Sequence, residues 1–211
     1  MLNKILIIIL VIKINILTVF FAQANEQFNF NISEIEILDN GNKVIGSNRG
    51  DITTNNGLTI SANSFEYDKV KNILNANGNV IINDQINDYK IFSNDIIYVK
   101  DEETIYSNDT TKAEIHSKYE ITSNDLVFSK NQSILYSNNK TKIIDKISKT
   151  LYSLDRFNFD ILNEILKGEK LLINMNYNLP ENNKLYFDNG IFDLKKKSFV
   201  AKDVTWRSIW F

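Results

Sequence analysis

The chain has 211 residues, of which 43% are hydrophobic, enough for one substantial folded domain or for a row of small stacked units. Its 24 basic and 26 acidic side chains give a formal net charge of -2, which argues against nucleic acid as a partner. The sequence contains no cysteine, so no disulfide framework stabilises it.

The first 24 residues have the pattern of an export signal. Lys4 precedes an apolar run over residues 5–12, and a second apolar run leads to Ala22-Gln23-Ala24, which has the spacing of a signal-peptidase site. Residues 1–24 are therefore predicted to be a signal peptide. The alternative is an uncleaved membrane anchor, which Lys13 disfavours because it interrupts the apolar stretch. In both cases the rest of the chain would be exported. The absence of cysteine fits the bacterial periplasm or envelope better than it fits a disulfide-rich secreted protein.

Alternating apolar and polar residues dominate the chain beyond residue 25. Phe28, Phe30 and Ile32 alternate with polar residues, and Asp39-Asn40-Gly41 marks a turn before an apolar strand through Val44. This pattern predicts a β-hairpin.

An apolar pair with one residue between its members recurs along the chain, at steps of 31, 30, 31 and 35 residues. The copies are Phe65-Glu66-Tyr67, Ile96-Ile97-Tyr98, Leu126-Val127-Phe128, Phe157-Asn158-Phe159 and, more loosely, Phe192-Asp193-Leu194. A second apolar strand follows each copy, beginning near Ile73, Ile105, Ile134, Ile165 and Phe199. Such a period predicts an all-β fold of stacked hairpin repeats, because one hairpin cannot bury its own apolar face. Residues 157–170 alone also fit helical spacing, but their register with the other copies favours strands.

Successive side chains of a strand point to opposite faces, so each apolar pair shares one face. Stacking the copies builds an apolar stripe from Phe65, Tyr67, Ile96, Tyr98, Leu126, Phe128, Phe157 and Phe159. The second strands, which carry Ile73, Ile105, Ile134 and Ile165, are expected to form the opposing wall. Two readings remain open: the walls meet in a dry core, as apolar stripes usually do, or they stand apart as a groove for a long apolar ligand.

Catalytic chemistry has little support in the sequence. His116 is the single histidine, and no second histidine or cysteine is present to complete a metal site with it. The acidic run Asp101-Glu102-Glu103 and the basic run Lys195-Lys196-Lys197 are typical of solvated turns. We therefore predict no catalytic residue, no metal and no cofactor.

The segment ISANSFEYDKVKNILNANGNV, residues 60–80, combines a small residue, an aromatic-x-Tyr-Asp ending and a Gly-Asn-Val after the second strand. It resembles the repeat of the OstA-like proteins of lipopolysaccharide transport, and the resemblance covers about residues 34–204. This family includes the periplasmic LptA, the anchored LptC and the N-terminal domain of the outer-membrane assembly protein LptD. The resemblance implies a twisted β-jellyroll over residues 25–205 whose apolar interior shelters lipopolysaccharide acyl chains on the way to the outer membrane. It implies no enzyme activity, and we carry over no role for Asp68.

The resemblance leaves the type of family member open. A cleaved signal suits an LptA-like protein and an uncleaved one an LptC-like protein. The aromatic end at residues 206–211 favours a truncated LptD-type chain that lacks its barrel. The implied partners are lipopolysaccharide, outer-membrane assembly components, and other jellyroll proteins that join through edge strands, for which residues 28–38 and 185–199 are the candidates. The alternative functions are a structural β-solenoid scaffold or adhesin with a dry core and, ranked last, an envelope hydrolase.

Overall fold

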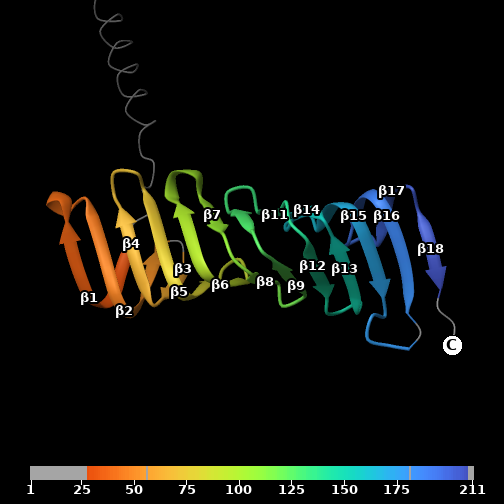
Figure 1. Ribbon diagram of the computed structural model, residues 1–211, viewed down its shortest axis with the longest axis horizontal. Helices are drawn as coiled ribbons and strands as arrows, with labels where there is room; N and C mark the ends of the chain where they lie inside the picture. Colours follow the sequence, from red (N-terminus) through yellow and green to blue (C-terminus); the bar gives the residue numbers. More distant parts are fainter. Residues whose placement is uncertain (1–27, 56, 181, 209–211) are drawn as a thin grey trace, which may run out of the picture.

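The computed structural model describes residues 28–55, 57–180 and 182–208, and this part of the chain is built almost entirely from β-strands (Figure 1). The all-β prediction is therefore confirmed. The predicted signal peptide at residues 1–24 and residues 209–211 of the aromatic end lie outside the described residues. Where the chain is described, no helix has the length and apolar character needed to cross a membrane.

The strands follow one another in chain order along the length of the molecule (Figure 1). They are β1 (Phe28–Leu38), β2 (Lys43–Thr54), β3 (Leu58–Ala62), β4 (Ser64–Asp68), β5 (Ile73–Asp84), β6 (Tyr89–Val99), β7 (Thr104–Ser107), β8 (Thr111–Ile115), β9 (Tyr119–Ser123), β10 (Val127–Ser129), β11 (Ile134–Ser137), β12 (Thr141–Asp145), β13 (Thr150–Leu154), β14 (Arg156–Asp160), β15 (Ile165–Met175), β16 (Asn183–Asp193), β17 (Ser198–Lys202) and β18 (Thr205–Ser208). Two short 3-10 turns, η2 (Asp39–Gly41) and η3 (Lys100–Glu102), occupy hairpin ends.

The antiparallel ladders form two layers. Layer 1 contains β4, β7, β10, β11, β14 and β17, whereas layer 2 contains β3, β8, β9, β12, β13 and β18. The long strands β1, β2, β5, β6, β15 and β16 belong to both layers, because one half of each pairs in layer 1 and the other half in layer 2. The backbone therefore joins the two layers along one lengthwise side, which we call the spine.

The chain changes layer at the spine through local breaks in strand geometry. In β5 the ladder with β6 shifts register between Asn77 and Val80, where Gly78 has a φ of +77°. Glycine adopts this left-handed conformation without steric cost, so the bend occurs there. In the central repeats the strands stop instead, and buried hydroxyls fill the spine: Thr141 donates to Ser123 over 2.9 Å.

On the side opposite the spine, the hairpin turns form two rows that we call the lips. The lip of layer 1 includes the turns at residues 69–72, 100–103, 130–133, 161–164 and 194–197. The lip of layer 2 includes the turns at residues 85–88, 116–118 and 146–149. The same kind of contact closes many of these turns. An aspartate that ends the preceding strand accepts hydrogen bonds from backbone amides of the turn, as Asp68 does from Val70 and Lys71, each over 3.0 Å.

The predicted repeat is present in the structure. The five apolar pairs lie in or next to β4, β6, β10, β14 and β16, and all of these segments belong to layer 1. Residues 157–170, which could also be read as a helix, form most of β14 and the first half of β15. The predicted hairpin around residues 39–41 is likewise present as β1, η2 and β2.

Candidate functional site

The space between the two layers is filled by one apolar cluster that runs through the whole ladder. The eight stripe residues predicted from the sequence all lie in it and are at most 7% exposed, and Ile105 joins them at 2%. The stripe consists of Phe65, Tyr67, Ile96, Tyr98, Leu126, Phe128, Phe157 and Phe159. The structure therefore brings nine of the twelve predicted residues together in the interior; contact with lipid at these positions stays a prediction.

The other three predicted residues, Ile73, Ile134 and Ile165, are half-buried on the outer surface of layer 1. Their chain neighbours Leu74, Leu135 and Leu166 point inward instead, and each is 0% exposed. Both residues of each pair are apolar, so the alternation in sequence does not decide which one faces inward. A shift of one residue moves a whole set of side chains to the other face of a strand.

The wall that faces the stripe also differs from the expectation. The two strands of each aligned hairpin pair side by side in layer 1, as β4 does with β5, so the second strand cannot lie opposite the first. Layer 2 supplies the opposing wall through residues such as Ile60, Ile91 and Ile121, each at most 3% exposed. These three residues begin the segments that precede the first three apolar pairs in the sequence. That recurring isoleucine is the signal by which the wall could have been found.

Across the interior the two layers touch through side chains. Aromatic rings from opposite layers meet edge to face, with centroids 5.0 Å apart for Phe28 and Tyr67 and 4.7 Å apart for Tyr89 and Phe128. Within the described residues, backbone hydrogen bonds connect turns along each lip, but none connects one lip to the other. The interior is therefore filled by side chains, and side-chain contacts alone close it at the lips.

One polar contact, which we call the clasp, links the two lips near the middle of the molecule. Glu164 in the lip of layer 1 accepts hydrogen bonds over 2.6 Å from Lys118, in the lip of layer 2, and from the hydroxyl of Tyr119. The side chains of Lys118 and Glu164 are only 22% and 15% exposed. Burial by itself would raise the pKa of Glu164, but the hydrogen bonds from Lys118 and Tyr119 outweigh it and hold this pKa below its ordinary value. Glu164 is therefore a carboxylate at neutral pH.

A hollow of about 410 Å³ lies between the lips next to the clasp. Ile86 and Tyr89 line it from layer 2, and Phe128 and Leu162 line it from layer 1. Ile86 and Leu162 are 73% and 65% exposed, although they are large and apolar. The rings of Tyr89 and Phe128, which are 5% and 4% exposed, lie at the floor of this hollow, and polar residues such as Asp88, Glu103 and Lys130 make up much of the rest of its lining.

The two ends of the ladder expose apolar side chains that belong to the interior face. Ile37 of β1 lies opposite the buried Val44 and is 63% exposed. At the other end, Phe199 of β17 lies opposite the buried Phe192 and is 48% exposed. In the described part of the chain, β1 pairs only with β2 and β17 only with β16, so both are edge strands. Residues 28–38 are therefore at an edge, as expected. Of the expected segment 185–199, only the end belongs to the edge strand β17, because β16 pairs with β15 on one side and with β17 and β18 on the other.

No group of three or more histidine, cysteine or acidic side chains that could hold a metal ion occurs among the described residues. His116 is exposed at the start of the turn between β8 and β9. The acidic run at 101–103 and the basic run at 195–197 both lie in hairpin turns, as expected.

No protein-family model matches the chain, and no curated protein matches it. Among solved structures, the chain is similar to LptH from Pseudomonas aeruginosa, described as the LptA homologous periplasmic component of the conserved lipopolysaccharide transport device. The TM-score is 0.47 at 12% sequence identity, over 52% of this chain and 80% of that one. The interior, the lips and the exposed apolar ends described above therefore carry the argument about function.

Proposed function

We propose that the chain is a non-enzymatic lipid conduit of the periplasm, which shelters the acyl chains of lipopolysaccharide between its two layers during transport to the outer membrane. One observation carries the proposal: the apolar interior is continuous from end to end, and side-chain contacts alone close it at the lips. A ligand with acyl chains can replace these contacts without breaking any ladder. Within this function we favour an LptD-type N-terminal domain whose residues 1–24 are a signal peptide.

The energetics of the exchange favour a ligand with long apolar chains. Each methylene that moves from water into an apolar interior contributes about 0.8 kcal/mol. An acyl chain of about a dozen methylenes can therefore compensate for the loss of several aromatic contacts. Each of these contacts contributes about 0.5–1.5 kcal/mol beyond its buried area. Sugars and phosphates of the same ligand would stay outside the lips, because burying them without partners is unfavourable.

The exposed ends extend the proposal to partners. An edge strand such as β1 or β17 presents unpaired backbone groups to which a strand of another protein can add. If that protein is a second jellyroll, the apolar faces of Ile37 or Phe199 would continue into its interior. Components of outer-membrane assembly are the other partners that we propose.

Site-specific photo-crosslinking with purified lipopolysaccharide tests the conduit. Probes at the inward positions Tyr98 and Phe128 are expected to form lipid adducts. Probes at their outward neighbours Ile97 and Val127, which are half-buried, serve as matched controls and are expected to form few. Equal labelling of the two sets, or no labelling at the inward positions, would contradict the proposal.

The second candidate is a structural scaffold, and the close packing of the interior favours it. Tyr98 and Leu74 are 0% exposed, as expected of a core that never opens. In that case the crosslinking experiment would give no adduct at Tyr98, whereas fibres or stable assemblies would form through the edge strands.

A further inference from the structure

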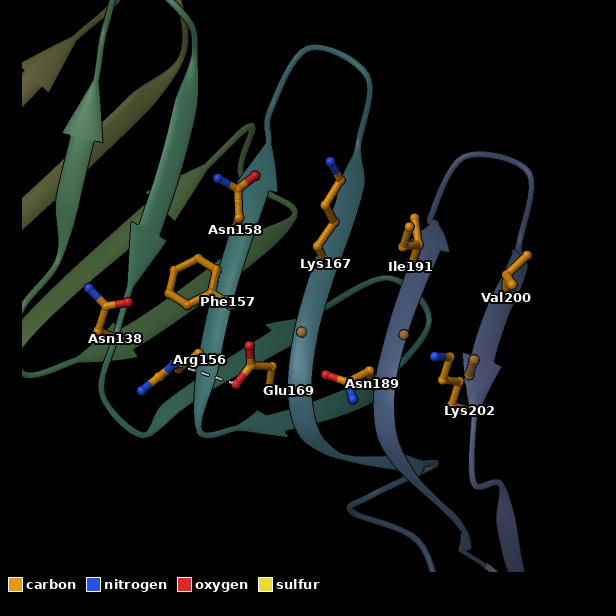
Figure 2. Close-up of a pocket in the computed structure, with 13 residues that line it drawn as sticks. Asn138, Arg156, Phe157, Asn158, Lys167, Glu169, Asn189, Ile191, Val200 and Lys202 are labelled. Atoms are coloured by element: carbon orange, nitrogen blue, oxygen red, sulfur yellow. Dashed lines mark ion pairs between the residues drawn. The ribbon is translucent and has the colours of Figure 1, made fainter.

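A separate hollow of about 540 Å³ lies on the outer surface of layer 1, near its C-terminal end. It crosses four neighbouring strands, β14, β15, β16 and β17, and Figure 2 shows the side chains that line it. The acyl-chain conduit proposed above uses the interior, so it assigns no role to this outer surface.

The ladder register explains the shape of this outer hollow. One row of outward side chains comprises Asn158, Lys167, Ile191 and Val200, and a parallel row comprises Arg156, Glu169, Asn189 and Lys202 (Figure 2). Gly168 and Gly190 lie opposite each other in the row between them. Because side chains alternate between faces, this middle row belongs to the inner face and leaves its backbone as the floor of a trough across the strands.

Positive charge predominates in the trough. Three cationic side chains, Arg156, Lys167 and Lys202, and one carboxylate, Glu169, line it. Arg156 and Glu169 form a long ion pair of 3.8 Å between exposed side chains. Within the described residues, Lys167 and Lys202 form no ion pair, so their charges are available to a ligand. A chain with a formal net charge of -2 thus carries a locally basic trough on this surface.

The uncharged lining narrows the class of ligand. Asn138, Asn158 and Asn189 each offer an amide that both donates and accepts hydrogen bonds, which suits hydroxyl groups; Asn189 also donates to the Asp188 carboxylate over 3.3 Å. Ile191 and Val200 add an apolar surface and are 49% and 77% exposed. The combination of hydroxyl partners, exposed cations and a small apolar surface fits a ligand that is rich in hydroxyls and also carries an oxyanion.

From this geometry we propose that the trough binds a saccharide that carries phosphate or carboxylate groups. Lys167 and Lys202, from opposite rows of the trough, would hold the anionic groups. The asparagine amides would bind ring hydroxyls, and the C–H face of a sugar would cover Ile191 and Val200. An acidic protein segment would also fit the cations, and its backbone could bind the amides, so the titration includes an acidic peptide to separate the two ligands.

Nuclear magnetic resonance titration tests the proposal, with the backbone amides of Gly168 and Gly190 as reporters on the floor of the trough. Glucose 6-phosphate is expected to shift both signals saturably, whereas glucose and inorganic phosphate alone are expected to act much more weakly. The double variant Lys167→Gln, Lys202→Gln is expected to weaken binding about fivefold, since exposed ion pairs contribute modestly. The double variant Lys90→Gln, Lys142→Gln removes two exposed strand lysines outside the trough; it is the matched control and should leave binding unchanged.

Three results would overturn the proposal. Equal shifts with inorganic phosphate would reduce the trough to a general anion site. Equal shifts with a poly-glutamate peptide would assign it to acidic protein segments. Loss of binding in Lys90→Gln, Lys142→Gln to the same extent as in Lys167→Gln, Lys202→Gln would show that overall charge, not the trough, is responsible.

Discussion

Replacing Glu164 with alanine is expected to loosen the two lips of the molecule. The substitution removes the shared acceptor of Lys118 and of the Tyr119 hydroxyl, both of which donate over 2.6 Å. Tyr119 is 0% exposed, so its hydroxyl would lose its partner in a buried place. An unsatisfied buried group costs about 1–3 kcal/mol, and Lys118 loses a partly buried ion pair as well. We expect the free energy of unfolding to fall by about 2–3 kcal/mol.

Urea denaturation measures the free energy of unfolding, and two further variants show how much of the loss comes from the clasp. Glu164→Gln keeps a hydrogen-bond acceptor and is expected to lose only about half as much. Glu66→Ala is the matched control, because Glu66 pairs with Lys43 over 2.9 Å on the outer surface of layer 1, where both side chains are more exposed. That control should change stability by no more than about 0.5 kcal/mol. Equal losses for Glu164→Ala and Glu66→Ala would refute the reasoning.

The pH dependence of stability gives an independent check on the clasp. The folded-state pKa of Glu164 lies below the ordinary value of 4.5, so its contribution is complete above that pH. The contribution is lost as the pH falls from 4.5 through the lower folded-state pKa. The difference in stability between the natural protein and Glu164→Gln should therefore shrink over this acidic range. A difference that grows on acidification would contradict the assignment.

Opening of the lips can be measured directly with spin labels at Ile86 and Leu162, which line the hollow from opposite lips and are both exposed. The distance distribution between the labels is expected to broaden and lengthen in Glu164→Ala and to stay unchanged in Glu66→Ala. This readout needs no lipid, so it tests the clasp separately from the conduit.

Four other substitutions probe the packing of the interior and the turns at the lips. Leu74→Ala is expected to cost about 2–5 kcal/mol in thermal or urea denaturation, and Ile73→Ala less than half of that, because only Leu74 faces the core. Gly50→Ala places a Cβ 2.6 Å from the carbonyl oxygen of Asn31, so about 1–3 kcal/mol of stability should be lost and hydrogen exchange of β1 should accelerate. Asp145→Ala leaves two turn amides without their acceptor and is expected to cost about 1–2 kcal/mol; a cost near zero would contradict the role given to these turns.

Much of the fold could be predicted because the repeat depends on the alternation of apolar and polar residues within each strand, and this alternation is local in the sequence. The alternation around Phe65 and Tyr67 predicts a strand, and the recurrence of that pair predicts stacking of hairpins. The interior stripe follows from the same alternation, and all eight of its residues are buried as expected.

The remaining features depend on information that periodicity does not contain. Where two apolar residues are adjacent, as in Ile73-Leu74, only the three-dimensional register decides which one faces inward. The fold of each repeat into two layers depends on bends such as the one at Gly78, which the sequence marks only as a glycine between strands. The clasp joins Lys118 to Glu164 across 46 residues, and each of them in sequence looks like a solvated turn residue.

The geometry of the lips and ends also bears on the choice between a conduit and a scaffold. A scaffold that assembles through its edge strands can use exposed apolar side chains at its ends, but it gains nothing from such side chains at its lips, where they favour unwanted association. Here Ile86 and Leu162 are exposed at the lips, and Ile37 and Phe199 are exposed at the ends. These four positions border the regions where an acyl chain would enter the interior from the side or pass beyond the ladder. Exposure at the lips is expected of a conduit and not of a scaffold. A closely packed interior is expected of a scaffold and also of a conduit without its ligand, so the lips discriminate between the two functions better than the core does.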